Sequence, residues 1–457
     1  MDRKKTRVCL YSLGCKVNGY ETDRMAEKFR EAGYRVVPPF DAADVYIINT
    51  CTVTNIADRK SRKMLRHAAK ANPDAVVVAA GCYVDAEKQF GAREADEKIA
   101  DLWVANKEKE KIVAIVEEYL ESRCDAAQVG VGEEKTKRTC EEDGNQSGEK
   151  EDVQINGHTR AYLKIQDGCN QFCSYCIIPF ARGRVVSRRP EEVLAETERL
   201  AAAGYREIVL TGIHISSYGL DFSKFDLIDL VREICSVNGI DRIRLGSMEP
   251  RIITEENIRA LAGLKKVCPH FHLSLQSGCD ATLRRMNRHY TAAEYLEKCE
   301  IIRRYFPDAA ITTDVIVGFP GETEEEFETT KEFLARVRFA RMHIFKYSAR
   351  RGTRAAVMDH QIPEPVKDAR SAILRKLNLE MEEAFARSFL EKTVDVLFEE
   401  TVESSEGERV AVGHTPQYLK VEVVTDRDLR NQILKVLLTR EMTERGEVRL
   451  QGDIISV

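Results

Sequence analysis

The chain of 457 residues has no apolar run that approaches the ~20 residues of a membrane-spanning helix. It also lacks the apolar region of a signal peptide, because the polar residues 1–7 run directly into a strand-like segment. Positive charge is not in excess either, since 70 Lys and Arg stand against 75 Asp and Glu, a net charge of −5. These absences predict a cytoplasmic protein with no membrane or DNA partner, in which local basic patches must bind any RNA.

Cysteine, by contrast, is abundant, with 13 residues in the chain. An odd number of cysteines without an export signal argues against a disulfide framework, because cytosolic thiols are kept reduced. Metal or redox chemistry explains such a cysteine content better than structural disulfides do.

Three of the cysteines, Cys169, Cys173 and Cys176, form a C-x3-C-x2-C motif. A structural zinc site would need a fourth ligand, and the motif supplies none. Three close thiolates can hold three irons of a [4Fe–4S] cluster and leave the fourth iron free for a small molecule. The alternatives are three buried thiols or an incomplete zinc knuckle.

Three more cysteines, Cys15, Cys51 and Cys82, each come just after a predicted strand. Ligands of open parallel sheets bind at the carboxyl ends of the strands, so these residues can converge in space. Gly14 and Gly81 would let the backbone turn tightly around a bulky inorganic group. The three thiols resemble a second three-thiolate cluster site, although each alone could be a small buried hydrophobe.

Residues 1–124 alternate short apolar strands with helical patterns, which predicts a parallel α/β sheet covered on both faces. Residues 125–154 are polar and acidic without apolar periodicity, so we interpret them as a linker. The predicted strands of the first region span residues 8–11, 45–48 and 75–79, with helices at 21–32 and 56–71.

Residues 155–389 contain six predicted strands with helical patterns between them, which indicates an open, partial (β/α)6 barrel. The C-x3-C-x2-C motif follows the first of these strands, at the rim where barrel active sites lie. The strands span residues 161–166, 207–211, 242–247, 271–276, 311–319 and 342–347, and the clearest helices span 190–203, 227–236, 292–305 and 365–389.

Residues 390–457 change character again, with strand-like runs separated by Gly, Ser, Asp and Asn. This pattern favours a small all-β barrel, and the alternative is an extra sheet packed on the core. The runs span residues 393–398, 408–412, 418–424 and 433–438.

With both cysteine triplets in view, the chain resembles the methylthiotransferase branch of the radical S-adenosylmethionine (SAM) enzymes over essentially its whole length. The resemblance implies a cluster-binding domain at 1–124, a radical SAM domain at 155–389 and a TRAM-like RNA-binding barrel at 390–457. It implies two [4Fe–4S] clusters and two SAM per turnover, with a reductant protein such as flavodoxin or ferredoxin. The cluster on Cys169, Cys173 and Cys176 would cleave SAM to a radical, and the one on Cys15, Cys51 and Cys82 would carry the sulfur. Since the cofactors carry this chemistry, no side chain is assigned as catalytic.

The motif Leu13-Gly14-Cys15-Lys16-Val17-Asn18 is most similar to the branch that methylthiolates carbon 2 of N6-threonylcarbamoyladenosine at position 37 of tRNA. Gly19 departs from that branch, which often has a more polar residue there. The alternatives are a transferase acting on isopentenyladenosine in tRNA or on a ribosomal-protein aspartate. A third is an iron–sulfur RNA-binding or redox-sensing protein without turnover.

Further candidates for SAM or nucleoside contacts follow from the resemblance and from position. Tyr175 is the aromatic residue that the family usually has before the third cysteine, and Arg184 follows the motif in a basic loop. Gly212 closes the second strand and would permit close approach of a ligand. Gln276 and Asp314 are polar residues in apolar strands, where burial without a partner costs stability.

Basic residues follow three of the rim strands and predict a track for RNA phosphates. A solvated basic loop is the simpler interpretation of each. We expect this track, together with the β-barrel tail, to hold an anticodon stem-loop. The candidate RNA contacts are Arg182, Arg188, Arg284, Arg288 and Arg350.

Overall fold

The computed structural model describes residues 3–39, 41–91, 99–128, 159–403, 407–444 and 446–455. From residue 129 onward the predicted acidic linker lies outside these residues. By its internal contacts the chain divides into two units, and the first consists of Met1–Gly157, Cys176–Arg184 and Ser348–Ala356. Within the described residues, no helix combines the length and apolarity needed to cross a membrane.

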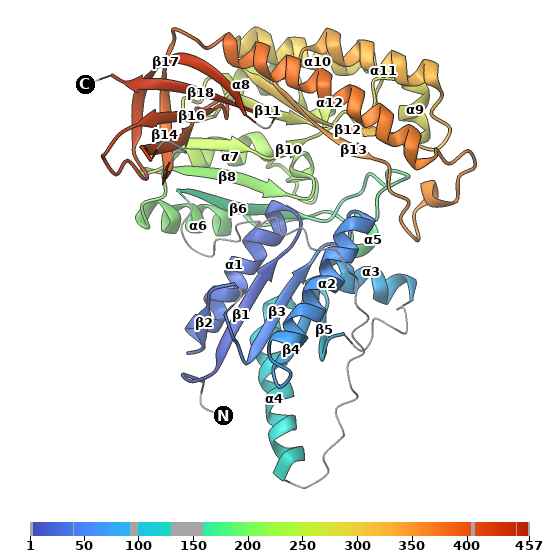
Figure 1. The fold of residues 1–457 in the computed structure, drawn as a ribbon, viewed down its shortest axis with the longest axis vertical. Helices are drawn as coiled ribbons and strands as arrows, with labels where there is room; N and C mark the ends of the chain where they lie inside the picture. The colour runs from blue at the N-terminus through green and yellow to red at the C-terminus, as the bar shows by residue number, and fades with distance from the viewer. Residues whose placement is uncertain are drawn as a thin grey trace. The chain divides into compact units, whose positions relative to one another are not determined.

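The first unit contains a five-stranded parallel sheet with the strand order β2-β1-β3-β4-β5 (Figure 1). Every residue of β3 and β4 is buried, as expected for inner strands covered on both faces. The three predicted strands are confirmed, and β2 and β5 are three-residue edge strands too short to give a sequence pattern. The strands are β1 (Arg7–Ser12), β2 (Arg35–Val37), β3 (Val45–Thr50), β4 (Val76–Gly81) and β5 (Leu102–Val104).

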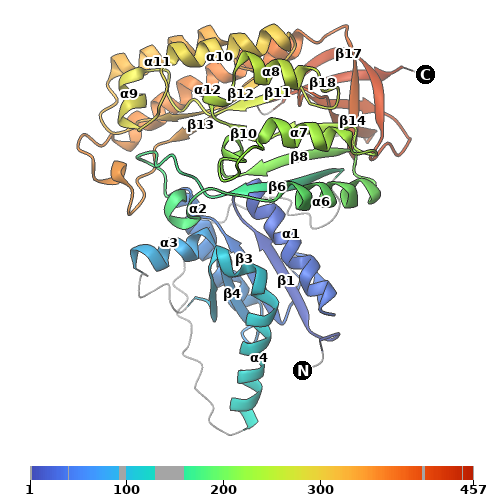
Figure 2. The same ribbon diagram turned by 180° about the vertical axis from the view of Figure 1, so that it is seen from behind.

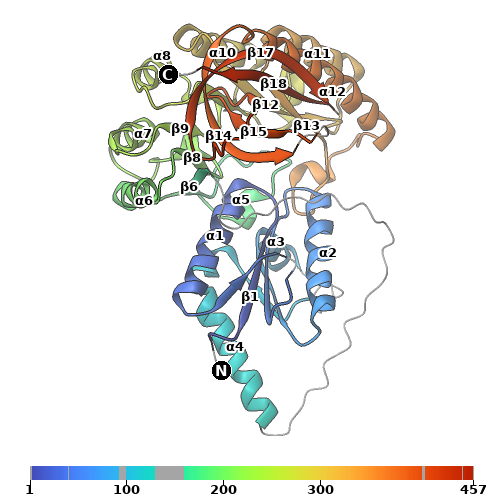
Figure 3. The ribbon, with the colours of Figure 1, turned by 60° about the vertical axis from the view of Figure 1, so that its left-hand side comes forward.

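Helices cover both faces of this sheet because alternate strand residues point to opposite sides (Figure 3). Val8 and Leu10 of β1 pack with the helices of one face, while Cys9 and Tyr11 belong to the core on the other. The first face carries α1 (Lys16–Glu31) and α4 (Ile112–Gln128), and the second carries α2 (Asn55–Ala71) and α3 (Cys82–Phe90). A short 3₁₀ helix, η1 (Asn106–Lys111), precedes α4.

The second unit contains six parallel strands that follow one another in chain order across two hydrogen-bonded sheets. The two sheets meet where Gly246 interrupts the run between β9 and β10, so the predicted open (β/α)6 barrel is confirmed. A two-residue strand, β7 (Val186–Ser187), adds an antiparallel edge to β6. The six-strand layer comprises β6 (Arg160–Asp167), β8 (Glu207–Gly212), β9 (Arg242–Leu245) with β10 (Ser247–Met248), β11 (His270–Leu273), β12 (Ala310–Val317) and β13 (Arg341–Lys346).

Helices lie along the outside of these strands and bury one continuous apolar core against them (Figures 1 and 2). Several begin with a side chain that accepts the free backbone N–H groups of the first turn, as Asp226, Thr291 and Thr323 do. The long helices are α6 (Pro190–Ala202), α7 (Leu227–Ser236), α8 (Glu255–Ala262), α10 (Ala292–Tyr305), α11 (Glu324–Val337) and α12 (Glu364–Arg387), and the short ones are α5 (Ile178–Ala181) and α9 (Asp280–Arg285).

The C-terminal region is a closed five-stranded barrel, so the predicted small barrel is confirmed and the alternative of an extra sheet is wrong. Gly413 and Gly452 allow strands to approach closely, because a Cβ at either would lie 2.4 Å from a carbonyl oxygen of the neighbouring strand. Sequence patterns missed the fifth strand, β18. The strands are β14 (Thr393–Glu403), β15 (Arg409–His414), β16 (Lys420–Val424), β17 (Ile433–Glu444) and β18 (Glu447–Ile454).

This barrel packs against the amino ends of the six-strand layer, within the second unit. Arg160, the first residue of β6, forms an ion pair of 2.8 Å with Glu399, and Arg242, the first residue of β9, donates to the carbonyl oxygen of His414. The loop that carries Cys169 lies at the opposite, carboxyl end of β6. Six to eight strand residues, roughly 20–26 Å, therefore separate the barrel from that loop. The expectation that the barrel and the basic rim together hold an anticodon stem-loop stays a prediction.

Candidate metal centres

The C-x3-C-x2-C motif occupies the loop between β6 and α5. Cys169 and Cys173 are 9% exposed, while Cys176 is partly exposed. Gly168 has a φ of +69° and Phe172 a φ of +49°, a left-handed conformation that a residue with a bulky side chain rarely adopts. The surrounding structure must therefore hold the loop in this shape.

The chain just after α9 supplies that support. Asn287 donates its side-chain N–H to the carbonyl oxygen of Phe172 at 3.1 Å. The backbone N–H of Ser174 donates to the carbonyl oxygen of Met286 at 3.0 Å, and the Ser174 hydroxyl donates to that of Arg285 at 2.8 Å. The cysteine loop is thus held by a side chain and two backbone carbonyl groups of a segment more than 100 residues away in sequence.

Gln166, which sequence reasoning missed, fixes the start of the same loop. Its side-chain N–H group donates to the carbonyl oxygens of Asp167 and Gly168, at 2.5 and 2.7 Å, and its Oε1 accepts the backbone N–H of His214. A Cβ at Gly212 would lie 3.0 Å from Gln166 Oε1. Close packing against Gln166 therefore explains why a glycine occupies position 212. The predicted contact of Gly212 with a cofactor stays a prediction.

Arg288 lies against one of the cysteines. It donates from a terminal nitrogen to Cys173 Sγ at 3.2 Å, from Nε to the Tyr290 hydroxyl at 2.9 Å and to the carbonyl oxygen of Ser274 at 3.2 Å. Burial raises the pKa of Cys169 and raises that of Tyr290 to about 12. The Arg288 guanidinium thus supports the cysteine loop, and its predicted contact with RNA stays a prediction.

The other residues predicted to contact SAM lie along the same carboxyl ends. Tyr175 packs edge-on against Phe319, with ring centroids 6.4 Å apart. Gln276 follows β11 with a φ of +76°, and its backbone N–H donates to the carbonyl oxygen of Asp314. Arg184 is exposed. Glu249, which no sequence pattern marked, follows β10 and is only 4% exposed. Their ligand contacts remain predictions.

The second cysteine triplet lies at one edge of the sheet in the first unit. Cys15 precedes α1 and is exposed, Cys51 follows β3, and Cys82 begins α3, the last two being buried. The strand register pairs Thr50 with Gly81, which brings the ends of β3 and β4 level. Burial raises the pKa of the Cys51 thiol to about 12, and the charges of Cys82 and Cys15 raise it further.

Two glycines make room for this arrangement. Gly14 has a φ of +100°, and a Cβ there would lie 2.6 Å from Cys51 Sγ. Gly81 also has a φ of +100°, and a Cβ there would lie 2.7 Å from the carbonyl oxygen of Thr50. Both positions therefore require glycine, as predicted for a backbone that turns around a bulky group.

The soft thiolates of each triplet suit an iron–sulfur cluster. Within the described parts of the chain, no three His, Cys, Asp or Glu side chains are placed to hold one metal ion together. Three thiolates in each triplet match the cysteine ligation of a [4Fe–4S] cluster that keeps one iron free. The donor sets therefore fit the group that the motifs imply.

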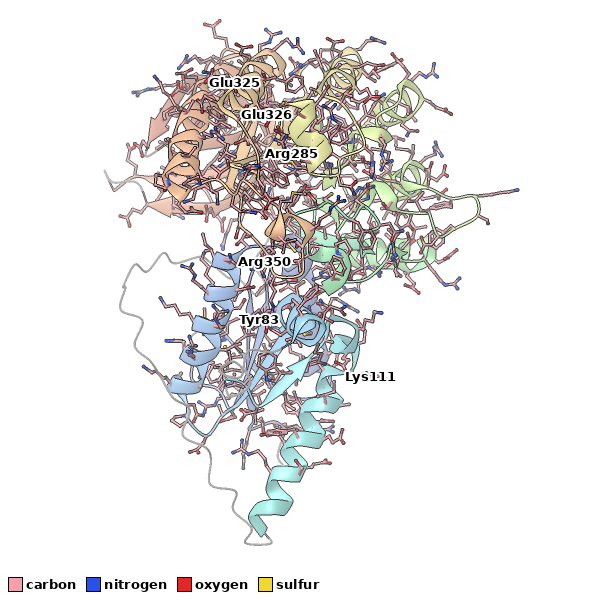
Figure 4. The ribbon with its side chains drawn as sticks, turned by 90° about the vertical axis from the view of Figure 1, so that its right-hand side faces the viewer. Tyr83, Lys111, Arg285, Glu325, Glu326 and Arg350 are labelled. Carbon is pink, nitrogen blue, oxygen red and sulfur yellow. The ribbon has the colours of Figure 1, made fainter. Side chains whose placement is uncertain are left out.

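Two predicted RNA contacts are buried in the first unit. The Arg182 side chain is fully buried, and it bonds to Glu21, Asn18 and Cys82. Arg350, labelled in Figure 4, is 6% exposed; it bonds to Thr52 and Asn55 and pairs with Asp58. Neither guanidinium is presented to a phosphate in this structure, so both have an internal role in place of the predicted one.

The remaining rim arginines differ in exposure. Arg188 donates to the carbonyl oxygen of Lys164 and pairs with Glu196 at 2.8 Å. Arg284 is exposed and stays a predicted RNA contact. Its neighbour Arg285 is directed toward Glu326, with which it forms an ion pair that ties α9 to α11 (Figure 4).

Comparison with known proteins decides the family. Two family models match the chain: the radical SAM superfamily over residues 163–334 and an uncharacterized protein family, UPF0004, over residues 7–105. A relative from Bacillus subtilis (strain 168), named threonylcarbamoyladenosine tRNA methylthiotransferase MtaB, is 40% identical over 435 residues, 95% of this chain and 94% of the relative. The chain belongs to the radical SAM methylthiotransferase family. It is therefore an enzyme that transfers a sulfur-containing group, with two [4Fe–4S] clusters and SAM as its cofactors.

Other members of this family extend the comparison. A protein of the same name from Aquifex aeolicus (strain VF5) is 41% identical over 380 residues, 83% of this chain and 89% of the relative. A tRNA-2-methylthio-N(6)-dimethylallyladenosine synthase from Desulfitobacterium hafniense (strain Y51) is 34% identical over 454 residues, 97% of each. Among solved structures, the radical SAM methyltransferase TsrM from Kitasatospora setae with cobalamin and [4Fe–4S] cluster bound has a TM-score of 0.54 at 16% identity, covering 78% of this chain and 77% of that one. That likeness concerns the fold.

Proposed function

We propose that this methylthiotransferase acts on carbon 2 of N6-threonylcarbamoyladenosine at position 37 of tRNA, giving 2-methylthio-N6-threonylcarbamoyladenosine. The observation that carries the proposal is the similarity, over nearly the whole chain, to relatives named for threonylcarbamoyladenosine tRNA. The motif Cys15-Lys16-Val17-Asn18 supports the same branch. The dimethylallyladenosine synthase from Desulfitobacterium hafniense, at 34% identity, is less similar than these two relatives.

We assign Cys169, Cys173 and Cys176 as ligands of one [4Fe–4S] cluster and Cys15, Cys51 and Cys82 as ligands of the other. When bound, these clusters and SAM supply the radical and sulfur chemistry that amino-acid side chains lack. The protein's own contribution is to fix the ligands. Asn287 holds the backbone of the Cys169–Cys176 loop in its left-handed turn at Phe172. Gly81 allows the tight backbone turn that precedes Cys82.

The first loop also keeps its surroundings dry. The aromatic ring of Tyr175 packs on buried Phe319, which in turn packs edge-on against Tyr347. An apolar wall beside the cysteines excludes water and other hydrogen donors, which a reactive radical would otherwise attack. Glu249 follows β10, and Asp314 lies within β12, where its carboxylate also contacts His272 Nε2 at 3.2 Å. Both are candidates for binding the ammonium group of SAM or nucleoside hydroxyls.

The C-terminal barrel serves the RNA in this proposal. Its exposed arginines, such as Arg427 and Arg440, suit stem phosphates. The loop base would reach the carboxyl end of the strands, where unstacked single-stranded bases commonly enter enzyme sites. Because the barrel lies at the amino ends of the strands, an anticodon stem-loop must span the length of the layer to contact both. A reductant protein of the flavodoxin or ferredoxin kind would deliver electrons.

The direct test compares two substrates. Anaerobically reconstituted enzyme, SAM and reductant are incubated with tRNA that carries threonylcarbamoyladenosine and, separately, with tRNA that carries dimethylallyladenosine. Mass spectrometry of the digested nucleosides should detect the methylthio product only in the first. Cys235→Ala is the matched control for loss of a thiol, because Cys235 lies in α7 outside both triplets. Product only from the second tRNA would refute the branch, and product from neither would favour a ribosomal-protein aspartate as substrate.

A further inference from the structure

A buried arginine connects Cys82 to the segment that follows the other cysteine motif. Arg182 caps α5, six residues after Cys176, and the segment Cys176–Arg184 belongs to the first unit. Its side chain has no exposed surface. Nε donates to Cys82 Sγ at 3.1 Å, and the two terminal nitrogens donate to Glu21 at 2.8 and 3.1 Å and to Asn18 Oδ1 at 2.7 Å.

A second side chain links the same two places. Asn106, at the start of η1, donates its side-chain N–H group toward Cys82 Sγ at 3.6 Å and to the carbonyl oxygen of Ala181 at 3.3 Å. Its backbone N–H is fixed by Asp85 at 2.9 Å. Cys82 therefore receives N–H donors from Arg182 at the end of α5 and from Asn106 in η1, and Asn106 also contacts the end of α5.

The charges around Arg182 indicate why a sulfur is its partner. Glu21 is shared by two buried cations, since Lys109 also donates to it at 2.6 Å. Asp85 lies within electrostatic range of both, and burial raises its pKa. A buried guanidinium is tolerated only when its donors are satisfied. A sulfur that binds iron is a stronger hydrogen-bond acceptor than a free thiol, so the 3.1 Å contact from Arg182 Nε suits Cys82 as a cluster ligand.

We propose that Arg182 is a positioning residue of the N-terminal cluster, whose hydrogen bond to Cys82 Sγ makes that cluster easier to reduce and holds the end of α5 against it. The inference rests on the proposed role of Cys82 as a ligand. Hydrogen bonds to cluster sulfurs favour the more negative, reduced state and so set the reduction potential. The segment directly after Cys176 would thereby contribute to the chemistry of a cluster bound by other residues.

The test measures the potential of the N-terminal cluster alone. Full-length protein with Cys169, Cys173 and Cys176 changed to Ala is reconstituted, and its cluster is titrated with reductant under electron paramagnetic resonance. Adding Arg182→Gln should lower the ratio of reduced to oxidised cluster about tenfold at a fixed solution potential, a shift of about 59 mV for one electron. Arg182→Lys keeps the positive charge but loses the planar guanidinium group, and it should shift the reduction potential less than Arg182→Gln does. Arg189→Gln changes an exposed arginine seven residues after Arg182 and should leave the reduction potential of the cluster unchanged.

Each outcome has a defined meaning. An unchanged potential in Arg182→Gln protein with its cluster intact overturns the proposal and leaves Arg182 a purely structural role. If Arg182→Gln binds no iron, Arg182→Lys takes its place, and an unchanged potential there has the same consequence. Absence of iron from the parent protein with an intact Cys15, Cys51 and Cys82 refutes the ligand assignment itself, which separates that failure from a failure of the Arg182 proposal.

Discussion

The two cysteine triplets differ in how the chain assembles them. Cys169, Cys173 and Cys176 are close because they share one eight-residue loop, whose shape depends on outside support from Asn287. The other triplet, Cys15, Cys51 and Cys82, spans 68 residues of the sequence. Its members lie at the same edge of the sheet only because β1, β3 and β4 are adjacent and parallel. The first triplet can be recognised from the spacing of its cysteines in the sequence. The second becomes a site only when the sheet forms and brings the strand ends together.

The two triplets nevertheless share one kind of contact. In each, an arginine from a different element donates to a cysteine sulfur: Arg288 to Cys173 at 3.2 Å and Arg182 to Cys82 at 3.1 Å. In both cases the sequence marked the arginine as a candidate RNA contact, because charge is visible in a sequence and burial is not. Basic residues beside a cysteine motif can therefore donate to a sulfur, which their charge alone does not reveal.

The largest expected effect concerns iron content. Reconstituted protein should bind about eight irons per chain, as two [4Fe–4S] clusters. Changing Cys169, Cys173 and Cys176 to Ala should leave about four, and the same change at Cys15, Cys51 and Cys82 should also leave about four. Iron analysis with electron paramagnetic resonance checks this. A full complement of iron in the second variant would contradict the dispersed site.

The dispersed triplet should be more sensitive to the backbone than the local one. Gly81→Ala places a Cβ 2.6 Å from Asn49 Oδ1 at φ +100° and ψ −161°, a region open essentially to glycine alone. We expect it to lower the free energy of unfolding by about 1–3 kcal/mol and to reduce iron binding by the N-terminal triplet. Thermal unfolding and iron content measure the two effects.

Gly19→Ala is the matched control for this substitution. Gly19 lies within α1, with nothing within 4 Å of a built Cβ and no positive φ. Alanine there should raise the free energy of unfolding by about 0.5–1 kcal/mol and leave iron binding unchanged. A loss of iron in Gly19→Ala equal to that in Gly81→Ala would show that the strained turn is not what matters.

A smaller effect is expected at the arginine of the local triplet. Arg288→Gln removes the donor to Cys173 and should lower reductive SAM cleavage roughly 10- to 100-fold, as changes just outside a metal site commonly do. Formation of 5′-deoxyadenosine measures this. Arg259→Gln, at an exposed arginine of α8, is the control that should retain full cleavage. Equal rates in the two variants would make the contact with Cys173 incidental.

The smallest expected effect is on tRNA binding, and it should occur without any change at the clusters. Changing the exposed barrel residues Arg427 and Arg440 to Gln should weaken tRNA binding, and each lost phosphate contact should reduce the salt slope by about 0.7–0.9. Iron content should not change. Glu400→Gln, at another exposed barrel position, is the control. An unchanged slope would place the RNA elsewhere. Deleting the barrel is a poorer test, because Arg160 would lose its partner Glu399.

Sequence patterns were most successful where periodicity is strong. The bounds of α7 and α10 agree with the predicted helices, and all six strands of the six-strand layer were foreseen. They failed for β2 and β5, which are too short for a period, and for β18, whose alternation Gly452 interrupts. The cysteines of both sites were visible in the sequence. Their supports were not, because the partners of Gln166 and Arg182 are set by tertiary contacts between distant segments.

The division of labour between the two triplets is tested most directly by one paired assay. Both triple-alanine variants are reconstituted with SAM, reductant and tRNA that carries threonylcarbamoyladenosine, and 5′-deoxyadenosine and the methylthio nucleoside are measured together. Without Cys169, Cys173 and Cys176, neither product should form. Without Cys15, Cys51 and Cys82, 5′-deoxyadenosine should still form while the methylthio nucleoside is absent. Loss of 5′-deoxyadenosine in both variants, with both proteins still folded by circular dichroism, would contradict the account.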